Sequence, residues 1–148
     1  MKKTHFVVLI LAISVLALFI IGRQIAQRNI EVIYLHNAHE ENNYYRKIDL
    51  KNKEYWKTGP REYSENVEYQ FVCNLESEKI ADFGDTCHDI GFFSWDEEYL
   101  LENPGFNSNM WWITVQYSDS SEKNMRGHGI YPETWIEFSI ALRELTGD

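Results

Sequence analysis

Trp111-Trp112-Ile113-Thr114-Val115-Gln116-Tyr117 is the stretch that decides the fold of this 148-residue chain. Its β-branched and aromatic residues are typical of a strand. Successive residues of a strand point to opposite sides of a sheet, so Trp111 and Trp112 cannot face the same core. The odd-numbered residues form the more apolar face, and we expect them to pack under helices. Trp112 therefore shares the other face with Thr114 and Gln116.

The polar turn after this strand leads to a partner strand at residues 123–128. If the hairpin loop has an odd number of residues, Met125 joins the core face. The other face then pairs Trp112 with His128, Thr114 with Arg126, and Gln116 with Asn124. An indole beside a histidine and an arginine is a platform for a sugar or a peptide, which makes Trp112, Thr114, Arg126 and His128 candidate binding residues. The alternative is that Trp112 packs beneath the first strand or residues 103–109.

The rest of the chain predicts further strands and two helices. Alternation indicates strands at residues 31–35, 67–72 and 93–101, a hairpin over 48–57, and a loop at 36–43. Helical spacing predicts one helix from an N-cap at Asn74 to Gly91 and a second that begins at Pro132 and ends at Gly147. This order predicts an α+β fold with one antiparallel sheet and two helices on one face.

An apolar run without charge occupies residues 6–21. Residues 5–22 would make about 27 Å of helix, close to the thickness of a bilayer core. A cleaved secretory signal is the alternative, but its apolar region usually spans ~7–15 residues, and the one plausible cleavage triplet, residues 15–17, lies inside the run. The sequence thus predicts a transmembrane anchor and juxtamembrane segment at residues 1–29, followed by one domain at residues 30–148.

The orientation of the anchor and the charge of the domain restrict the partners. Lys2 and Lys3 in a very short N-terminal tail favour a cytoplasmic N-terminus and an extracytoplasmic domain, although Arg23 and Arg28 nearly balance them. These four basic residues precede Ile30 and no acidic residue does, so the formal charge of −9 becomes −13 for residues 30–148. Such a surface repels phosphate backbones, so we expect no nucleic-acid partner.

Cys73 and Cys87 are the only cysteines. Outside the cell they could form one disulfide; the alternative is two buried thiols. His36, His39 and Glu40 have side chains of the kinds that bind metals, but they lie in a polar loop with no further ligand in register. The acidic stripe of the first predicted helix fits a solvated helix face better than a calcium site. Cys87, His88 and Asp89 are adjacent on a helix and so cannot face one another. We expect no metal, no cofactor and no enzymatic activity.

The chain resembles small uncharacterised membrane-anchored or lipid-anchored proteins of Gram-positive, Firmicute-type bacteria. The resemblance is carried by residues 112–117, Asp119, residues 127–132, Trp135 and Leu142, and by the hairpin at residues 48–53. Members often have Asp-Gly where this chain has Asp119-Ser120, which leaves its turn geometry open. The resemblance implies a location in the bacterial cell envelope and no activity, cofactor or catalytic residue.

Together these patterns predict a single-pass protein of the cell membrane. Its domain is expected to bind a partner protein, a peptide or a glycan of the envelope without catalysis. One alternative is a cytoplasm-facing inhibitor or immunity-like protein whose acidic surface engages a basic partner. A second is a glycan hydrolase, which requires two carboxylates facing each other at roughly 5–10 Å.

Overall fold

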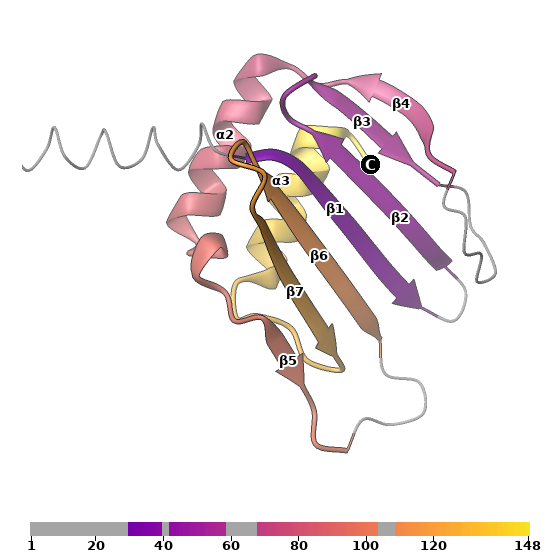
Figure 1. Ribbon diagram of the computed structural model, residues 1–148, viewed down its shortest axis with the longest axis vertical. Helices are drawn as coiled ribbons and strands as arrows, with labels where there is room; N and C mark the ends of the chain where they lie inside the picture. Colours follow the sequence, from indigo (N-terminus) through magenta and orange to yellow (C-terminus); the bar gives the residue numbers. More distant parts are fainter. Residues whose placement is uncertain (1–29, 40–41, 59–67, 104–108) are drawn as a thin grey trace, which may run out of the picture.

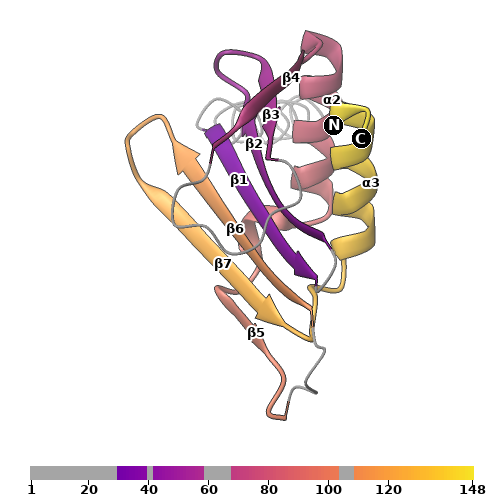
Figure 2. The same cartoon turned by 90° about the vertical axis from the view of Figure 1, so that its right-hand side faces the viewer.

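The computed structural model describes residues 30–39, 42–58, 68–103 and 109–148. Within these residues, seven strands form one sheet in the order β4-β3-β2-β1-β6-β7-β5. The strands are β1 (Ile30–His39), β2 (Asn42–Asp49), β3 (Glu54–Lys57), β4 (Gln70–Asn74), β5 (Glu98–Leu100), β6 (Met110–Tyr117) and β7 (Glu122–His128). Helices α2 (Ser77–Asp89) and α3 (Trp135–Thr146) pack on one face of the sheet, as Figures 1 and 2 show, and a short 3-10 turn, η1 (Phe92–Ser94), follows α2.

The α+β class is confirmed, but the prediction of a purely antiparallel sheet is wrong. The edge strand β5 pairs in parallel with β7, with Tyr99 opposite Gly127. The reason is topological. β6 reverses the direction of β5 and lies beside β1, and β7 reverses the direction again before it fills the place between β6 and β5. All other pairs of neighbouring strands are antiparallel.

Strand β6 supplies the centre of the core, as its sequence predicts. Trp111, Ile113 and Val115 are buried, and so is Met125 on the paired strand β7. They pack with buried residues of β1 and with the apolar stripe of α3, which includes Phe138. The alternation of β6 therefore places its odd-numbered side chains under the helices and its even-numbered ones on the other side of the sheet. We call that other side, left uncovered by α2 and α3, the open face.

Helices α2 and α3 end close to the glycines predicted to end them, but both begin later in the sequence than predicted. Gly91 and Gly147 both adopt left-handed backbone, with φ of 68° and 75°. Asn74 does not cap α2, because it belongs to β4 and pairs there with Glu54. Helix α3 begins at Trp135 rather than at Pro132, whose carbonyl accepts a hydrogen bond from the Trp135 N–H at 3.0 Å.

Two further local predictions are wrong. Residues 93–101 do not form one strand: the aromatic residues at its start form η1, where Phe92 stacks on Phe138 with ring centroids 4.8 Å apart. Tertiary packing of these rings overrides the alternating pattern. Residues 36–39 and 42–43 are strand rather than loop, because β1 pairs with β2 and β6 over its whole length despite its polar composition.

The predicted anchor, residues 6–21, lies outside the described residues. None of the helices that the structure describes is both long and apolar enough to cross a bilayer.

Candidate functional site

The four candidate binding residues lie on β6 and β7, but the strand register differs from the predicted one by two residues. Trp112 lies opposite Arg126, Thr114 opposite Asn124, and His128 opposite Met110. The prediction that Met125 faces the core is confirmed, whereas the predicted cross-strand partners are wrong. The reason is the tight turn at residues 118–121, where Ser120 takes a left-handed φ of 66° and shortens the connection.

Trp112 is part of a row of stacked rings that crosses three strands on the open face. Its indole stacks on His36 of β1 with centroids 4.8 Å apart and planes 13° apart. The His36 ring stacks in turn on Tyr45 of β2 at 3.9 Å and 8°. Trp112 therefore packs against the first strand, as the alternative reading proposed, yet it remains only half-buried. Because all three rings stand on strands of the sheet, their stacking fixes the plane of the Trp112 indole.

A cavity of about 270 Å³ lies beside Trp112 at the β6–β7–β5 side of the open face. Trp112, Thr114 and Arg126 line it, so three of the four candidate residues meet at one site. Glu97 and Glu98, which come from the β5 segment, also line the cavity, and Asn124 completes its polar lining. The combination of one aromatic ring with several polar groups is typical of a small recognition pocket.

The polar groups of the cavity hold one another in place. Arg126 forms an ion pair with the Glu98 carboxylate across the parallel β5–β7 pair. The Thr114 hydroxyl donates to Asn124 Oδ1 at 2.6 Å. The backbone N–H of Arg126 donates to the Glu97 carbonyl at 2.9 Å, which fixes the start of β5 against β7. The charges of Arg126 and Glu98 therefore offset each other.

His128 does not line the cavity, and four contributors to the site escaped prediction. His36 and Tyr45 fell in or beside a segment predicted to be loop, so their stacking had no signal. Glu97 and Glu98 reach the site only through the parallel pairing of β5. The alternating sequence around Glu97 and Glu98 suggests a strand, but it does not indicate that this strand pairs with β7.

Both cysteines are free thiols in the structure. Cys73 on β4 is half-buried, with its Sγ 3.9 Å from the Thr146 carbonyl oxygen. Cys87 on α2 is 1% exposed, and burial raises the pKa of its thiol well above the usual value. A thiol that stays protonated is a poor nucleophile. The His88–Asp89 contact, at 3.5 Å, lies on the outer side of α2 and does not engage Cys87.

The described residues contain no group of three or more histidine, cysteine, aspartate or glutamate side chains placed to hold a metal ion. Glu40, part of the histidine-rich segment weighed for metal binding, lies outside the described residues.

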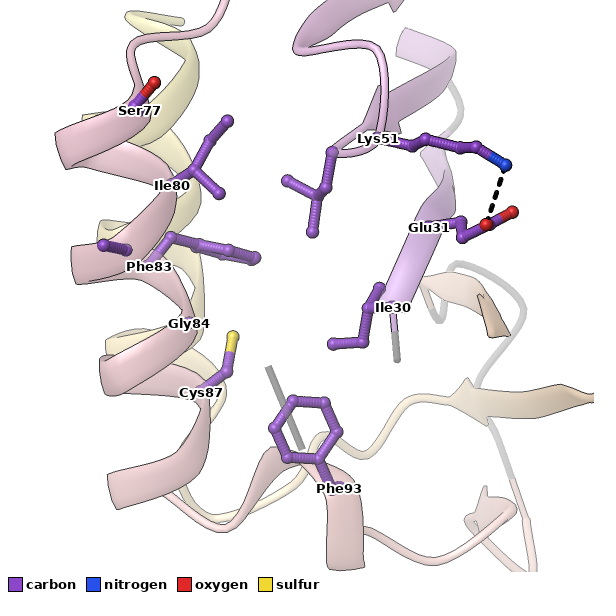
Figure 3. Close-up of a pocket in the computed structure, with 11 residues that line it drawn as sticks. Ile30, Glu31, Lys51, Ser77, Ile80, Phe83, Gly84, Cys87 and Phe93 are labelled. Atoms are coloured by element: carbon purple, nitrogen blue, oxygen red, sulfur yellow. Dashed lines mark hydrogen bonds and ion pairs between the residues drawn. The ribbon is translucent and has the colours of Figure 1, made fainter. Parts of the chain in front are cut away.

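A second, apolar groove lies on the helix side of the sheet and has no counterpart in the predictions. It encloses about 400 Å³ between α2, the start of β1 and the turn that joins β2 to β3. Figure 3 shows Ile80, Phe83 and Cys87 pointing from α2 toward Ile30, with Phe93 closing one end. At the rim, Lys51 Nζ forms an ion pair with Glu31 Oε1 at 2.8 Å.

Comparison of the chain with protein-family models, with curated proteins and with solved structures gives no match.

Proposed function

We propose that this chain is a membrane-tethered, non-enzymatic domain that binds a basic peptide segment of a partner protein at the open face of its sheet. The tether is the apolar run at residues 6–21, and the domain lies on the extracytoplasmic side. The observation that carries the proposal is the cavity beside Trp112, whose lining also includes two glutamates, next to the row of stacked rings.

Charge favours a basic ligand. Residues 30–148 carry a formal charge of −13, so a cationic segment is attracted to the domain from a distance. At the cavity itself, Glu97 and Glu98 are acidic residues of the lining, and the indole of Trp112 provides a face that attracts ammonium and guanidinium groups. A lysine or arginine side chain therefore fits both the long-range and the local electrostatics.

The arrangement of the carboxylates supports binding rather than hydrolysis. Glu97 and Glu98 are consecutive in sequence, and Glu98 is paired with Arg126. A glycan hydrolase instead places two carboxylates on opposite sides of the scissile bond. Glu97 and Glu98 are the two acidic residues in the lining of the cavity.

The test measures binding of a fluorescein-labelled lysine-rich octapeptide to the full chain in phosphatidylcholine nanodiscs, by fluorescence anisotropy. We expect saturable binding that weakens about tenfold in Trp112→Leu, the loss of roughly 1.4 kcal/mol. Trp56→Leu is the matched control, because Trp56 lies on β3, outside the cavity lining. Its affinity should equal that of the wild type.

Two results would contradict the proposal. Equal affinity of Trp112→Leu and the wild type would show that the peptide binds by net charge alone. Tighter binding of an unlabelled chitooligosaccharide, measured by competition in the same assay, would show that the site is built for a glycan instead of a basic peptide.

A further inference from the structure

The apolar groove between α2 and β1 lies where the chain enters the described domain. Ile30, the first residue of β1, forms part of its wall. Only eight residues, 22–29, separate Ile30 from the end of the apolar run at residue 21. Even fully extended, eight residues span at most about 29 Å. With residues 6–21 in the bilayer, as the proposed function has it, the start of the groove at Ile30 lies no farther than this distance from the membrane surface.

The walls of the groove suit a ligand without hydrogen-bonding groups. Ile30, Leu50, Ile80, Phe83 and Phe93 present hydrocarbon to its interior. The charged groups at its rim, Glu31 and Lys51, satisfy each other. A peptide backbone in this groove would bury N–H and C=O groups against hydrocarbon, which is unfavourable without partners. An acyl chain has no polar group to bury, and it covers apolar wall that otherwise contacts water.

We propose that this groove holds one acyl chain of a bilayer phospholipid beside the tether. The inference rests on the tether of the proposed function and is independent of the ligand at the open face. Its volume of about 400 Å³ falls within the range of pockets that take small apolar ligands. Lys51 and Ser77, at the mouth, are the groups nearest to where the lipid ester and headgroup would lie.

The experiment uses the full chain in nanodiscs that contain phosphatidylcholine with a diazirine near the end of one acyl chain. After irradiation, digestion and mass spectrometry locate the labelled residues. We expect label on residues 6–21, which contact the bilayer, and also on the groove residues of α2, between Ile80 and Cys87. The groove label is the specific prediction.

A matched pair of variants tests whether the label reports the groove. Ala81→Phe adds a ring to the groove lining from an exposed position, whereas Asp82→Phe adds the same ring at a position of α2 outside the lining. Label on α2 should be lost in Ala81→Phe and retained in Asp82→Phe. Both positions are exposed, so the core remains intact in both variants.

The outcomes separate this inference from the proposed function. Label on residues 6–21 with none on the groove, or equal groove label in both variants, would overturn the acyl-chain site and leave the tether standing. Absence of label from residues 6–21 as well would overturn the tether and the groove proposal together.

Discussion

Gly127 and Trp111 face each other across β6 and β7, and the indole of Trp111 lies directly over the glycine. A Cβ atom at position 127 would come within 2.1 Å of Trp111 Nε1. The ring cannot move aside easily, because it is fully buried and its Nε1 donates to the Ile130 carbonyl at 2.9 Å. This contact requires glycine at a position that is otherwise ordinary strand.

We expect Gly127→Ala to lower the free energy of unfolding by about 1–3 kcal/mol, the usual cost of overpacking a well-filled core. Urea unfolding of the full chain in detergent, monitored by tryptophan fluorescence, measures the change. Gly84→Ala, in α2, is the contrasting variant and should stabilise the protein by about 0.5–1 kcal/mol, because alanine is the better helix former. Equal effects of the two variants would contradict the steric explanation.

Asp148 joins the end of the α3 segment to the strands beneath it. Its Oδ2 accepts hydrogen bonds from Lys57 Nζ at 2.6 Å and from the Tyr55 hydroxyl at 2.8 Å, and Arg46 Nε lies 3.7 Å away. The hydrogen bond from Lys57 holds the pKa of the Asp148 carboxyl below its usual value of 3.8, against the opposing effect of desolvation. Desolvation, aided by the bond to Asp148, raises the pKa of Tyr55 well above its usual value.

Because the folded state lowers the pKa of Asp148, the carboxylate stabilises the fold above pH 3.8, and this contribution is lost as the pH falls through the lowered pKa. Asp148→Asn should therefore cost about 0.5–1 kcal/mol at pH 7, a small value because the side chain is one-third exposed. The difference from wild type should shrink as the pH falls below 3.8. Urea unfolding over a series of pH values from 7 downward measures it, with Asp82→Asn as a control that changes little across the series.

Lys123 connects strand β7 to the 3-10 turn η1. Its ammonium donates to the carbonyl oxygens of Phe93 at 2.8 Å and of Trp95 at 2.7 Å, while the side chain is half-buried. These two bonds satisfy backbone groups at the end of η1 and fix the segment that leads to β5. Since β5 supplies Glu98 to the cavity, Lys123 also positions one wall of the candidate site.

We expect Lys123→Met to lower the free energy of unfolding by about 1.5–3 kcal/mol, because two charge-assisted hydrogen bonds are lost. Amide hydrogen exchange should rise first at residues 92–100. Lys79→Met is the control, since Lys79 is exposed and pairs with Glu76, the N-cap residue of its own helix, at 3.3 Å. A uniform rise in exchange over the whole sheet would contradict the local role assigned to Lys123.

The elements that could be predicted are those whose apolar residues repeat with a regular period. The sequence predicted β6, its partner β7 and the apolar stripe of α3. Each of these elements buries one side against the core, which makes its apolar residues recur with the period of a strand or a helix. The segment at residues 92–100 was not, because Phe92 and Trp95 are buried by ring packing rather than by strand alternation. The extension of β1 and β2 was missed because sheet pairing stabilises polar residues that have little strand propensity.

The candidate site was predicted in part for the same reason. Alternation along β6 is enough to place Trp112 and Thr114 on the open face. The register of β7 depends on the turn, and Ser120 holds a backbone conformation that serine seldom adopts, so counting residues gave the wrong partners. The parallel neighbour β5 follows from the path of the whole chain and has no local signal.

The sheet separates the two candidate surfaces. The cavity beside Trp112 opens on the open face, whereas the apolar groove lies among residues of α2 on the helix side. Figure 2 shows the two helices confined to that second side. A ligand on one face therefore need not displace a ligand on the other, so the proposed peptide site and the proposed acyl-chain site are compatible.

If the proposed tether spans a membrane, the side that holds the domain decides which partners the domain can meet. Lys2 and Lys3 favour a cytoplasmic N-terminus, so a C-terminal tag should be outside the membrane. Asp148 is held against β3, and the tag therefore needs a cleavable linker to be accessible to a protease. Treatment of intact, wall-stripped cells with a protease that cannot cross the membrane should remove the tag from the membrane-bound chain.

Permeabilised cells provide the control, because the linker must be cut there whichever way the chain is oriented. A tag that is lost only after permeabilisation would place the domain in the cytoplasm. The extracytoplasmic part of the proposed function would then be wrong, but the proposed preference for a basic ligand would stand, because Glu97 and Glu98 line the cavity in either compartment. The search for its ligand would move to basic segments of cytoplasmic proteins.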